Sequence, residues 1–444
     1  MRSSAASDVY KRQAIIAEFN PLHSGHEYII KEARRITCAD CIVVVLSGGF
    51  TQRGDIAIAP KHARAAAAID CGADIVFELP FVYATSSAEF FASGAIALLN
   101  SLKKIDFLVF GTESSDISAL SAAAELLIKE PPELKAVLNS CLTSGMSFPA
   151  ALGQAYSACS GTNAIFTPNN TLAIEYIKAI KKMSSDIQPV AVQRSGLGYN
   201  DINYSKAGGH ISASAFRTTT ENIIKSGHFL SNNSIPPELE AFMSETLPAA
   251  SAHSALSGYN RIFPVFNDDM FTLIRYAILM NRSHLEDFCD FTPALSNRIQ
   301  RLLDKEGTSL FSGSYEDFIL RIKTKEMTAA RIKRAMLHLL TGYTDEACRT
   351  AVNYLRKGYS PYARILALSP SGQTFIGAVK KGCDTILINS LGKSMPLLDE
   401  NAQSVMHYDI LASDIYSSIV ADKFGYTMPD EYRSGVARIT HSPT

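Results

Sequence analysis

Three features that would each place a protein in a particular class are missing from this sequence of 444 residues. The formal net charge is only −1, from 42 Lys and Arg against 43 Asp and Glu, so no global field attracts the chain to nucleic acid or to an acidic membrane. No apolar run approaches the roughly 18 residues that a membrane-spanning helix needs, and no apolar leader follows a charged start. We therefore expect no membrane partner, and any affinity for RNA must come from a local patch of charge.

The cysteines also lack a pattern. Eight of them are scattered without even spacing, which is not typical of a disulfide framework. Together with the missing leader, this favours a reducing cytoplasm as the location. The first thirteen residues, MRSSAASDVYKRQ, are small and polar without periodicity, and we expect residues 1–13 to be a disordered or cloning-derived extension.

Short apolar runs alternate with longer amphipathic stretches from residue 14 to about residue 192. The runs expected to be strands are AIIAE (14–18), CIVVVLS (41–47), DIVFEL (74–79), IDFLVF (105–110) and PVAVQR (189–194). Apolar residues recur at helical spacing in the ranges 26–35, 61–70 and 88–99 between them. This order predicts a doubly wound, Rossmann-like parallel α/β sheet. Ligands of such sheets bind beyond the carboxyl ends of the strands, so the loops that follow the strands should converge on one cleft.

A boundary between domains is expected in LSNNSIPPELE (230–240), which combines turn formers with two prolines. Residues 14–233 would then form the α/β unit. Residues 238–444 would form a second, mainly α-helical domain that ends in a small α/β element, made of YARILALS (362–369) and TILIN (385–389).

Two histidines three residues apart follow the first predicted strand. Pro21 turns the chain off the strand, Gly25 lets the backbone approach a ligand, and His26 falls near the start of a helix. A helix N-terminus is a ready site for phosphate, and imidazoles beside it can hydrogen-bond the oxygens of an α-phosphate during its transfer. The alternatives are packed loop histidines or an H-x-x-H zinc pair. Zinc is disfavoured because no further Cys or His cluster follows at ligand spacing, so we expect no metal site held by the protein.

A second phosphate-binding segment is predicted in ISASAFR (211–217). Ser212 and Ser214 lie at a predicted helix start, where hydroxyl and N–H groups can meet the β- and γ-phosphates. Arg217, one turn later, can hold these phosphates bidentately. The alternative is a plain serine N-cap followed by a surface arginine.

The stretch EFNPLHSGHEYI (18–29) resembles the [HT]-x-G-H signature of the nucleotidylyltransferase superfamily, and more narrowly the opening of the tRNA(Met) cytidine acetate ligase family. Further blocks match that family in order: LSGGFTQRGD, K-x-x-R as Lys61 and Arg64, GADIVFELP, GTES, TPNNTLAIEYIKAI, QRSGLGYND and ISASAFR. Phe19, Leu22 and Ser24 depart from the tyrosine, phenylalanine and asparagine common there. These departures bear on the shape of the pocket and leave both histidines and Gly25 intact.

The resemblance implies that ATP is a cosubstrate, with Mg²⁺ as its usual partner. The segment from Ile16 to Ile29 would wrap ATP, and Gly111, Asn169 and Arg194 match further nucleotide contacts of the family. The predicted ATP-binding residues are Ile16, Ala17, Glu18, Phe19, Asn20, Pro21, Leu22, His23, Ser24, Gly25, His26, Glu27, Tyr28, Ile29, Gly111, Asn169, Arg194, Ser212 and Ser214. The predicted catalytic residues are His23, His26 and Arg217.

Other residues are candidates for contact with the second substrate. Arg53 and Asp55 could bind a carboxylate or the target base, or could form an ion pair across a turn. Lys61 and Arg64 share a helical face and could reach phosphates or RNA, or could be solvated. Beyond residue 320, basic residues crowd together with Tyr354 and Tyr362 between them, which suits phosphate contact and base stacking on RNA but also a solvated helical face. These basic residues are Arg321, Lys323, Lys325, Arg331, Lys333, Arg334, Arg349, Arg356, Lys357 and Arg364.

These features together favour an ATP-dependent ligase. As the resemblance implies, it would activate acetate as acetyl-adenylate and transfer the acetyl group to N4 of the wobble cytidine of elongator tRNA(Met), giving N4-acetylcytidine. One alternative is a small-molecule nucleotidylyltransferase of the pantetheine-phosphate or nicotinamide-mononucleotide kind. Another is a non-catalytic RNA-binding protein that keeps a nucleotide-binding fold.

Overall fold

The computed structural model describes residues 10–113, 116–162, 166–193, 211–226 and 234–439. In these residues one mixed sheet has the strand order β5-β4-β1-β2-β3-β6-β7, with β8 beside β6. The strands are β1 (Arg12–Ala17), β2 (Cys41–Ser47), β3 (Ile75–Leu79), β4 (Phe107–Thr112), β5 (Gln188–Gln193), β6 (Tyr362–Leu368), β7 (Ile386–Ile388) and β8 (Ala437–Arg438). Strands β1 to β5 are all parallel to their neighbours among themselves, so the predicted doubly wound parallel sheet is confirmed.

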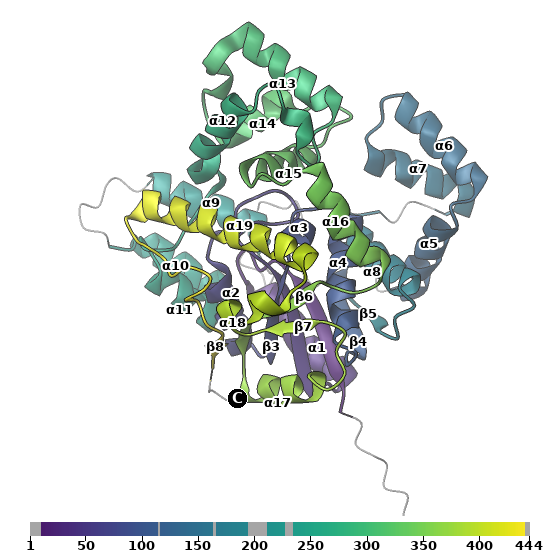
Figure 1. The fold of residues 1–444 in the computed structure, drawn as a ribbon, viewed down its shortest axis with the longest axis vertical. Helices are drawn as coiled ribbons and strands as arrows, with labels where there is room; N and C mark the ends of the chain where they lie inside the picture. The colour runs from purple at the N-terminus through teal and green to yellow at the C-terminus, as the bar shows by residue number, and fades with distance from the viewer. Residues whose placement is uncertain (1–9, 114–115, 163–165, 194–210, 227–233, 440–444) are drawn as a thin grey trace, which may run out of the picture.

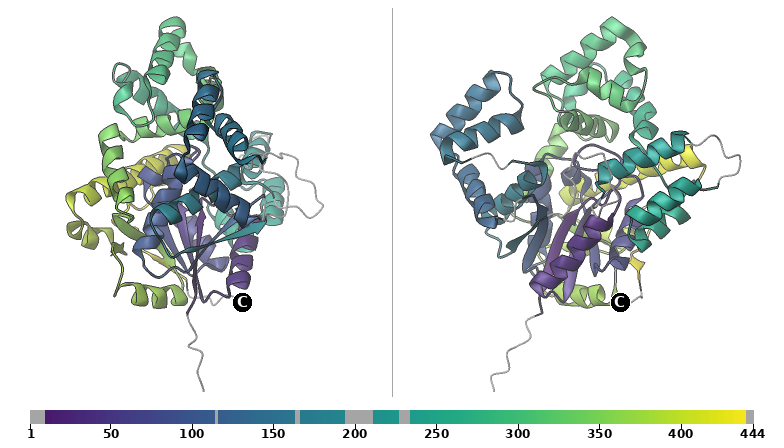
Figure 2. Two further views of the ribbon diagram at one scale, coloured as in Figure 1. Left: turned by 90° about the vertical axis from the view of Figure 1, so that its right-hand side faces the viewer. Right: turned by 180° about the vertical axis from the view of Figure 1, so that it is seen from behind.

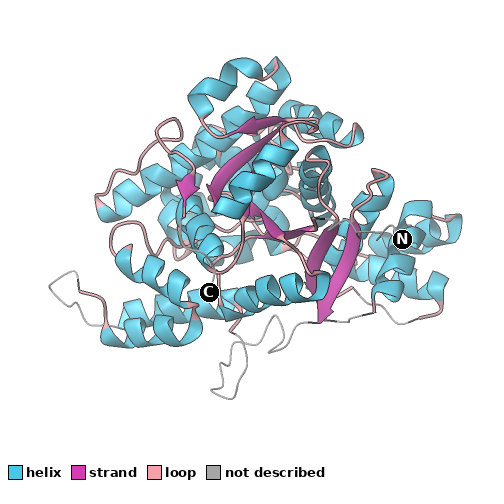
Figure 3. Ribbon diagram, turned by 90° about the horizontal axis from the view of Figure 1, so that it is seen from below, coloured by secondary structure: helices cyan, strands magenta, loops and turns pink. Residues whose placement is uncertain are grey.

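Helices surround this sheet (Figures 1 and 3). The first nine are α1 (Ser24–Thr37), α2 (Lys61–Asp70), α3 (Phe81–Ala84), α4 (Ala88–Ser101), α5 (Ile117–Lys129), α6 (Pro132–Thr143), α7 (Phe148–Ser160), α8 (Pro168–Lys182) and α9 (Ala213–Ser226). The helical segment that follows holds α10 (Pro237–Thr246), α11 (Ala249–Ser257), α12 (Phe271–Met280), α13 (Pro293–Glu306), α14 (Tyr315–Ile322), α15 (Ala329–Leu340) and α16 (Asp345–Arg356). The last helices are α17 (Pro370–Val379), α18 (Leu391–Ser394) and α19 (Glu400–Phe424).

The side-chain alternation of the central strands explains why both faces of the sheet are covered. Val43 and Val45 of β2 belong to the apolar core that includes α4 and α8. Val44, between them, belongs to a second core that includes Ile30 of α1 and Ala65 of α2. Every residue of β2 is buried, as expected for a strand that packs against helices on both sides.

The first strand begins earlier than the sequence predicted. β1 starts at Arg12, inside the range that we assigned to an extension, and its Gln13 is fully buried. The Oε1 atom of Gln13 accepts a hydrogen bond of 2.5 Å from the hydroxyl of Thr37. This buried bond allows a polar residue to occupy a strand position. The prediction relied on apolar residues, so it placed the start of the strand too late in the sequence. Residues 1–9 lie outside the described part of the chain.

The expected terminal α/β element is present, but it is not separate from the first sheet. β6 pairs with β3 in antiparallel orientation, and β7 and β8 pair with β6. Gly372 of α17 packs so closely against β3 that a Cβ there would lie 2.0 Å from the carbonyl oxygen of Asp74. The sequence of a short strand does not indicate which sheet the strand joins. We therefore assigned residues 362–444 to the second domain, although their strands complete the first sheet. Part of the predicted boundary, residues 230–233, lies outside the described residues.

Figures 1 and 2 show where the helices lie that do not cover the sheet. α12, α13 and α14 lie beyond the end of the sheet where the strands β1 to β4 terminate, and α5, α6 and α7 form an arm beside them (Figures 1 and 2). α15 and α16 connect the α12–α14 group to the sheet. Among the described residues, no helix combines the length and apolar character that crossing a bilayer requires.

Candidate active site

Both histidines of the motif stand at the N-terminus of α1. His23 is the N-cap residue, and its Nδ1 accepts a hydrogen bond of 3.2 Å from the backbone N of Gly25. The backbone N of His23 in turn donates to Nδ1 of His26 at 3.3 Å, and the two rings stack with centroids 3.8 Å apart. Because both Nδ1 atoms accept, the neutral rings carry their hydrogen on Nε2. The motif therefore presents two imidazole donors beside the partial positive charge of a helix start.

Neighbouring residues hold this loop in place. The side-chain Oδ1 of Asn20 accepts from the backbone N of Ile58 at 2.8 Å, which ties the histidine loop to the loop after β2. Phe19 has φ +46° and packs edge-on against His26, with ring centroids 5.1 Å apart. Phe19 and Leu22, two positions at which the sequence departs from the family, are both buried, and Phe19 also lines the cavity described next.

A cavity of about 500 Å³ opens at the carboxyl ends of β1 and β4. It brings together residues from eight separate parts of the chain, and the loops after β1, β2 and β4 are among them, as the doubly wound pattern predicted. The predicted site residues that line it are Ile16, Ala17, Glu18, Phe19, Asn20, His23, His26, Ile29, Arg53, Asp55, Gly111, Asn169, Ser212 and Arg217. Seven predicted ATP-binding residues are not among its lining: Pro21, Leu22, Ser24, Gly25, Glu27, Tyr28 and Ser214. Arg194 lies outside the described residues, and which side chains touch a nucleotide stays a prediction.

One wall of this cavity contains residues that the sequence did not single out. Glu113 lies outside the lining, but it accepts hydrogen bonds of 2.6 Å from both Thr167 and the lining residue Asn169, so it joins the loop after β4 to the start of α8. Phe110 and Tyr176 supply an aromatic surface with ring centroids 5.7 Å apart. In the sequence these two residues look like ordinary core, because nothing in a strand or helix pattern tells a cavity-facing ring from a packed one.

Arg217 and Asp55 also line this cavity and lie close to each other. Arg217 donates to the carbonyl oxygen of Asn20 at 2.8 Å, and its guanidinium lies 3.6 Å from the carboxylate of Asp55. Burial favours a higher pKa for Asp55, but the charges of Lys333, at 2.8 Å, and Arg217 outweigh it and hold this pKa below its usual value. Asp55 is therefore ionised, and the ion pairs it forms are with distant segments rather than with Arg53 across a turn.

Two predicted substrate contacts, Lys61 and Arg64, are corrected by the structure. Arg64 is 3% exposed and donates to the backbone carbonyls of Glu18, Gly48 and Ala59, and burial lowers its pKa to about 10. Lys61 is also buried and pairs with Glu78 at 2.6 Å. The shared helical face was predicted correctly, but it points into the protein, so these side chains are not solvated and lie outside the lining of the histidine cavity.

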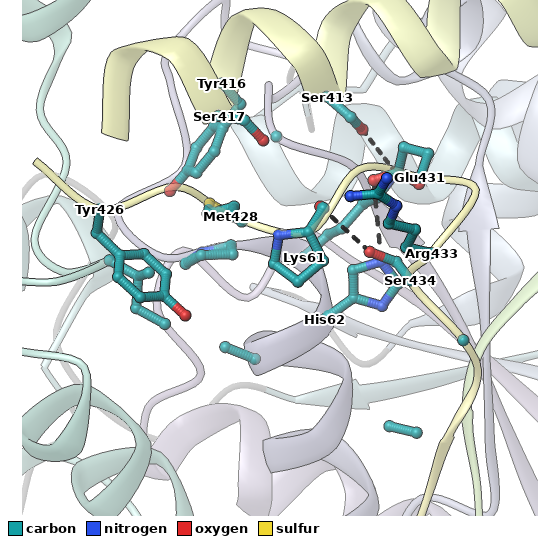
Figure 4. Close-up of a pocket in the computed structure, with 17 residues that line it drawn as sticks. Lys61, His62, Ser413, Tyr416, Ser417, Tyr426, Met428, Glu431, Arg433 and Ser434 are labelled. Atoms are coloured by element: carbon teal, nitrogen blue, oxygen red, sulfur yellow. Dashed lines mark hydrogen bonds and ion pairs between the residues drawn. The ribbon is translucent and has the colours of Figure 1, made fainter. Parts of the chain in front are cut away.

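Lys61 instead lines a different cavity, of about 370 Å³, between α2, α19 and the C-terminal segment (Figure 4). Glu431 lies 3.1 Å from Lys61 there and also pairs with Arg364. Burial and the neighbouring charge of Lys61 lower the pKa of His62, which lines the same cavity, to about 4. This cavity shares no lining residue with the cavity at the histidines.

The predicted basic surface is only partly exposed. Arg334 and Arg364 are buried, and Arg334 contacts Asp290 and the carbonyl of Gln52, each at 3.4 Å. Tyr354 and Tyr362 are buried as well, which contradicts a role for them in base stacking. The exposed members are Arg321, Lys323, Lys325, Arg331, Arg349, Arg356 and Lys357. Lys333 is half-buried and reaches Asp55.

Residues 10–429 match the family model described as HIGH nucleotidyl transferase, and the fold and the histidine cavity agree with that class of protein. The chain is 34% identical to the tRNA(Met) cytidine acetate ligase of Clostridium perfringens, over 91% of this chain and 94% of that one. It is also 34% identical to the tRNA(Met) cytidine acetate ligase of Caldicellulosiruptor saccharolyticus, over 92% and 94% of the two chains. This chain belongs to the tRNA(Met) cytidine acetate ligase family.

Solved structures give the same result. The crystal structure of Thermotoga maritima TmcAL bound with alpha-thio ATP is similar with a TM-score of 0.81 at 26% identity, covering 97% of this chain and 100% of that one. The apo form of the same protein gives a TM-score of 0.83 at 27% identity, with the same coverage. The fold is thus one that binds an ATP analogue in a relative.

Proposed function

We propose that this protein is an ATP-dependent ligase that activates acetate as acetyl-adenylate and acetylates N4 of the wobble cytidine of elongator tRNA(Met), giving N4-acetylcytidine. The main support is the cavity that gathers both motif histidines, Gly111, Asn169 and Arg217 in a member of this ligase family. The alternative, a small-molecule nucleotidylyltransferase, has no such support. The relatives named above are ligases, and the similarity extends over nearly their whole length. We infer a cytoplasmic location, where ATP and tRNA are both present.

In the first step a carboxylate oxygen of acetate attacks the α-phosphorus of ATP. The bond from the α-phosphorus to the bridging oxygen breaks, and pyrophosphate leaves with the bond's electrons. His23 and His26 donate to the non-bridging oxygens, on which charge grows in the transition state. A preorganised donor of this kind contributes about 3 kcal/mol. Arg217 neutralises the pyrophosphate, and its present contacts, with the Asn20 carbonyl and Asp55, hold it at the wall of the same cavity.

Mg²⁺ enters this proposal with the nucleotide. In the described residues no three His, Cys, Asp or Glu side chains come together as a metal site. Mg²⁺ commonly binds through substrate phosphates, water and one or two carboxylates. The carboxyl group of Glu18 lines the cavity and fits that limited role. When bound, Mg²⁺ would supply charge neutralisation on the phosphates.

The test is the product. The protein is incubated with ATP, acetate and unmodified tRNA(Met), the RNA is digested, and the nucleosides are analysed by mass spectrometry. We expect N4-acetylcytidine that depends on both ATP and acetate. A stable dinucleotide would favour the small-molecule enzyme instead, and tRNA retention without pyrophosphate release would favour the non-catalytic RNA-binding protein.

A further inference from the structure

A second cavity of about 500 Å³ lies directly beside the nucleotide cavity. Arg53, Asp55, Arg217 and Ala330 line both, so the two cavities adjoin. The rest of its lining comes from Ile56, from α9, from residues 265–268, and from the starts of α14 and α15. The second cavity is therefore formed where the α/β unit and the helical segment meet.

Two carboxylates are held together on the wall of this cavity. The Nζ atom of Lys333 lies 2.8 Å from Asp55 and 2.5 Å from Glu316. The side-chain nitrogen of Asn267 donates to the same two carboxylates, at 2.9 and 3.2 Å. An ionised carboxylate accepts about four hydrogen bonds, so both groups retain capacity for a further donor. Asp55 is common to both cavities, whereas Glu316 and Lys333 line only the second.

This lining suits a nucleoside with an amino group. Carboxylates accept hydrogen bonds from the N4 amine of cytosine, and Arg53 and Lys333 suit the phosphates that flank a base. The volume is in the range of ordinary ligand pockets. The cavity of Figure 4 cannot play this part, because it shares no lining residue with the nucleotide cavity.

We propose that the second cavity is the subsite for the acceptor cytidine, with its exocyclic amine directed towards Asp55 and Glu316. This inference rests on the proposed function and names the place where its second substrate binds. Because Asp55 lines both cavities, an amine at Asp55 lies beside an acetyl-adenylate in the first cavity. Its nitrogen bonds to the acetyl carbon, the bond from that carbon to the phosphate oxygen breaks, AMP leaves with the electrons, and the amine proton passes to water.

The subsite must be reached by a base that has left the stack of its loop. Enzymes that act on a base commonly bind it unstacked in a pocket that reads its hydrogen-bonding edge. The exposed basic residues Lys323, Lys325 and Arg331 lie just before and within the start of α15, close in sequence to Ala329 and Ala330 of the cavity wall. RNA phosphates held there would place a neighbouring base at the cavity.

The test fills the second cavity and leaves the first intact. Thr218 of α9 is exposed and lines only the second cavity, so Thr218→Phe narrows it. Asn222→Phe, one turn further along α9 and in the lining of neither cavity, is the matched control. Adenylate formation is measured as acetate-dependent exchange of pyrophosphate into ATP without tRNA, and transfer as N4-acetylcytidine formed on tRNA(Met).

We expect Thr218→Phe to keep exchange within about twofold of wild type and to lower transfer at least tenfold, while Asn222→Phe changes neither. Glu316→Gln, which keeps its size but replaces one acceptor oxygen with a donor, should lower kcat/KM for tRNA about tenfold with exchange unchanged. Wild-type transfer by a folded Thr218→Phe variant would overturn the subsite. Loss of exchange together with transfer would also overturn it, because the cavity would then serve acetate activation. Absence of N4-acetylcytidine from the wild-type reaction would instead refute the proposed function itself.

Discussion

The contact between Gly54 and α15 gives the sharpest prediction, because it holds the helical segment against the loop after β2. Gly54 has φ +80°, and a Cβ there would lie 2.5 Å from Cβ of Lys333 and 2.6 Å from the backbone N of Arg334. Real Cβ atoms do not approach backbone this closely, so Gly54→Ala must move α15 away from the loop. The ion pair between Lys333 and Asp55 would lengthen as a result.

The magnitude follows from two contributions. A left-handed backbone conformation costs about 1 kcal/mol for alanine relative to glycine. Overpacking against a rigid neighbour adds about 1–3 kcal/mol. We therefore expect Gly54→Ala to lower the free energy of unfolding by about 2–4 kcal/mol. Gly342, just beyond the C-terminal end of α15, has φ +65°, and a Cβ there would meet no atom within 4 Å. Gly342→Ala should therefore lower the free energy of unfolding by the backbone contribution alone, about 1 kcal/mol.

Urea unfolding of both variants, followed by circular dichroism, measures the difference between them. Acetyl transfer to tRNA(Met) should also fall more in Gly54→Ala than in Gly342→Ala, because only the former separates the walls of the second cavity. Equal losses of stability in the two variants would show that the loop and α15 separate freely. The reasoning from close packing would then be wrong.

Three further predictions concern the site, the RNA and the buried charges. His26→Ala should slow acetate-dependent exchange of pyrophosphate into ATP by about 10² to 10³-fold, and an unchanged rate would contradict its role as a donor. Affinity for tRNA in a filter-binding assay should fall steeply between roughly 50 and 200 mM salt if exposed basic residues bind phosphates, and a flat response would remove them from the proposal. Because the pKa of His62 is about 4 in the folded protein and near 6.5 in the unfolded chain, only the unfolded chain takes up this proton as the pH falls between those values. Through this group, the free energy of unfolding should then fall by up to about 1.4 kcal/mol for each pH unit of acidification. Urea titration at pH 6.5 and 4.5 measures this pH dependence, and His62→Gln should remove the part that His62 contributes.

Much of the α/β unit could be predicted from the sequence because burial on both faces leaves a strong pattern. CIVVVLS coincides with β2, and the range 61–70 coincides with α2. The histidine loop could be predicted for a related reason: a strand, a proline, a glycine and a helix start restrict one short segment so tightly that its two imidazoles have few other places to lie. Local constraints of this kind depend only on residues that are adjacent in the sequence.

The remainder depended on contacts between distant segments. Lys61 and Arg64 were assigned to a common face correctly, yet only the packing of α2 against the loop after β2 shows that the face is buried. Asp55 could be recognised as a polar loop residue, but its partners Lys333 and Asn267 lie more than 200 residues away. Spacing along a helix or loop carries no information about such partners.

The order of the strands explains why a division of the chain at its prolines is insufficient. All five residues of β3 and all seven of β6 are buried, and they lie side by side although almost 300 residues separate them. Without β6, β3 would be an exposed apolar edge, which is prone to pair with other chains. The helical segment is thus an insertion whose two ends are anchored in one sheet, at β5 and at β6. This anchoring, together with the contact between Gly54 and α15, places α15 against the loop after β2, and residues of both segments line the two cavities.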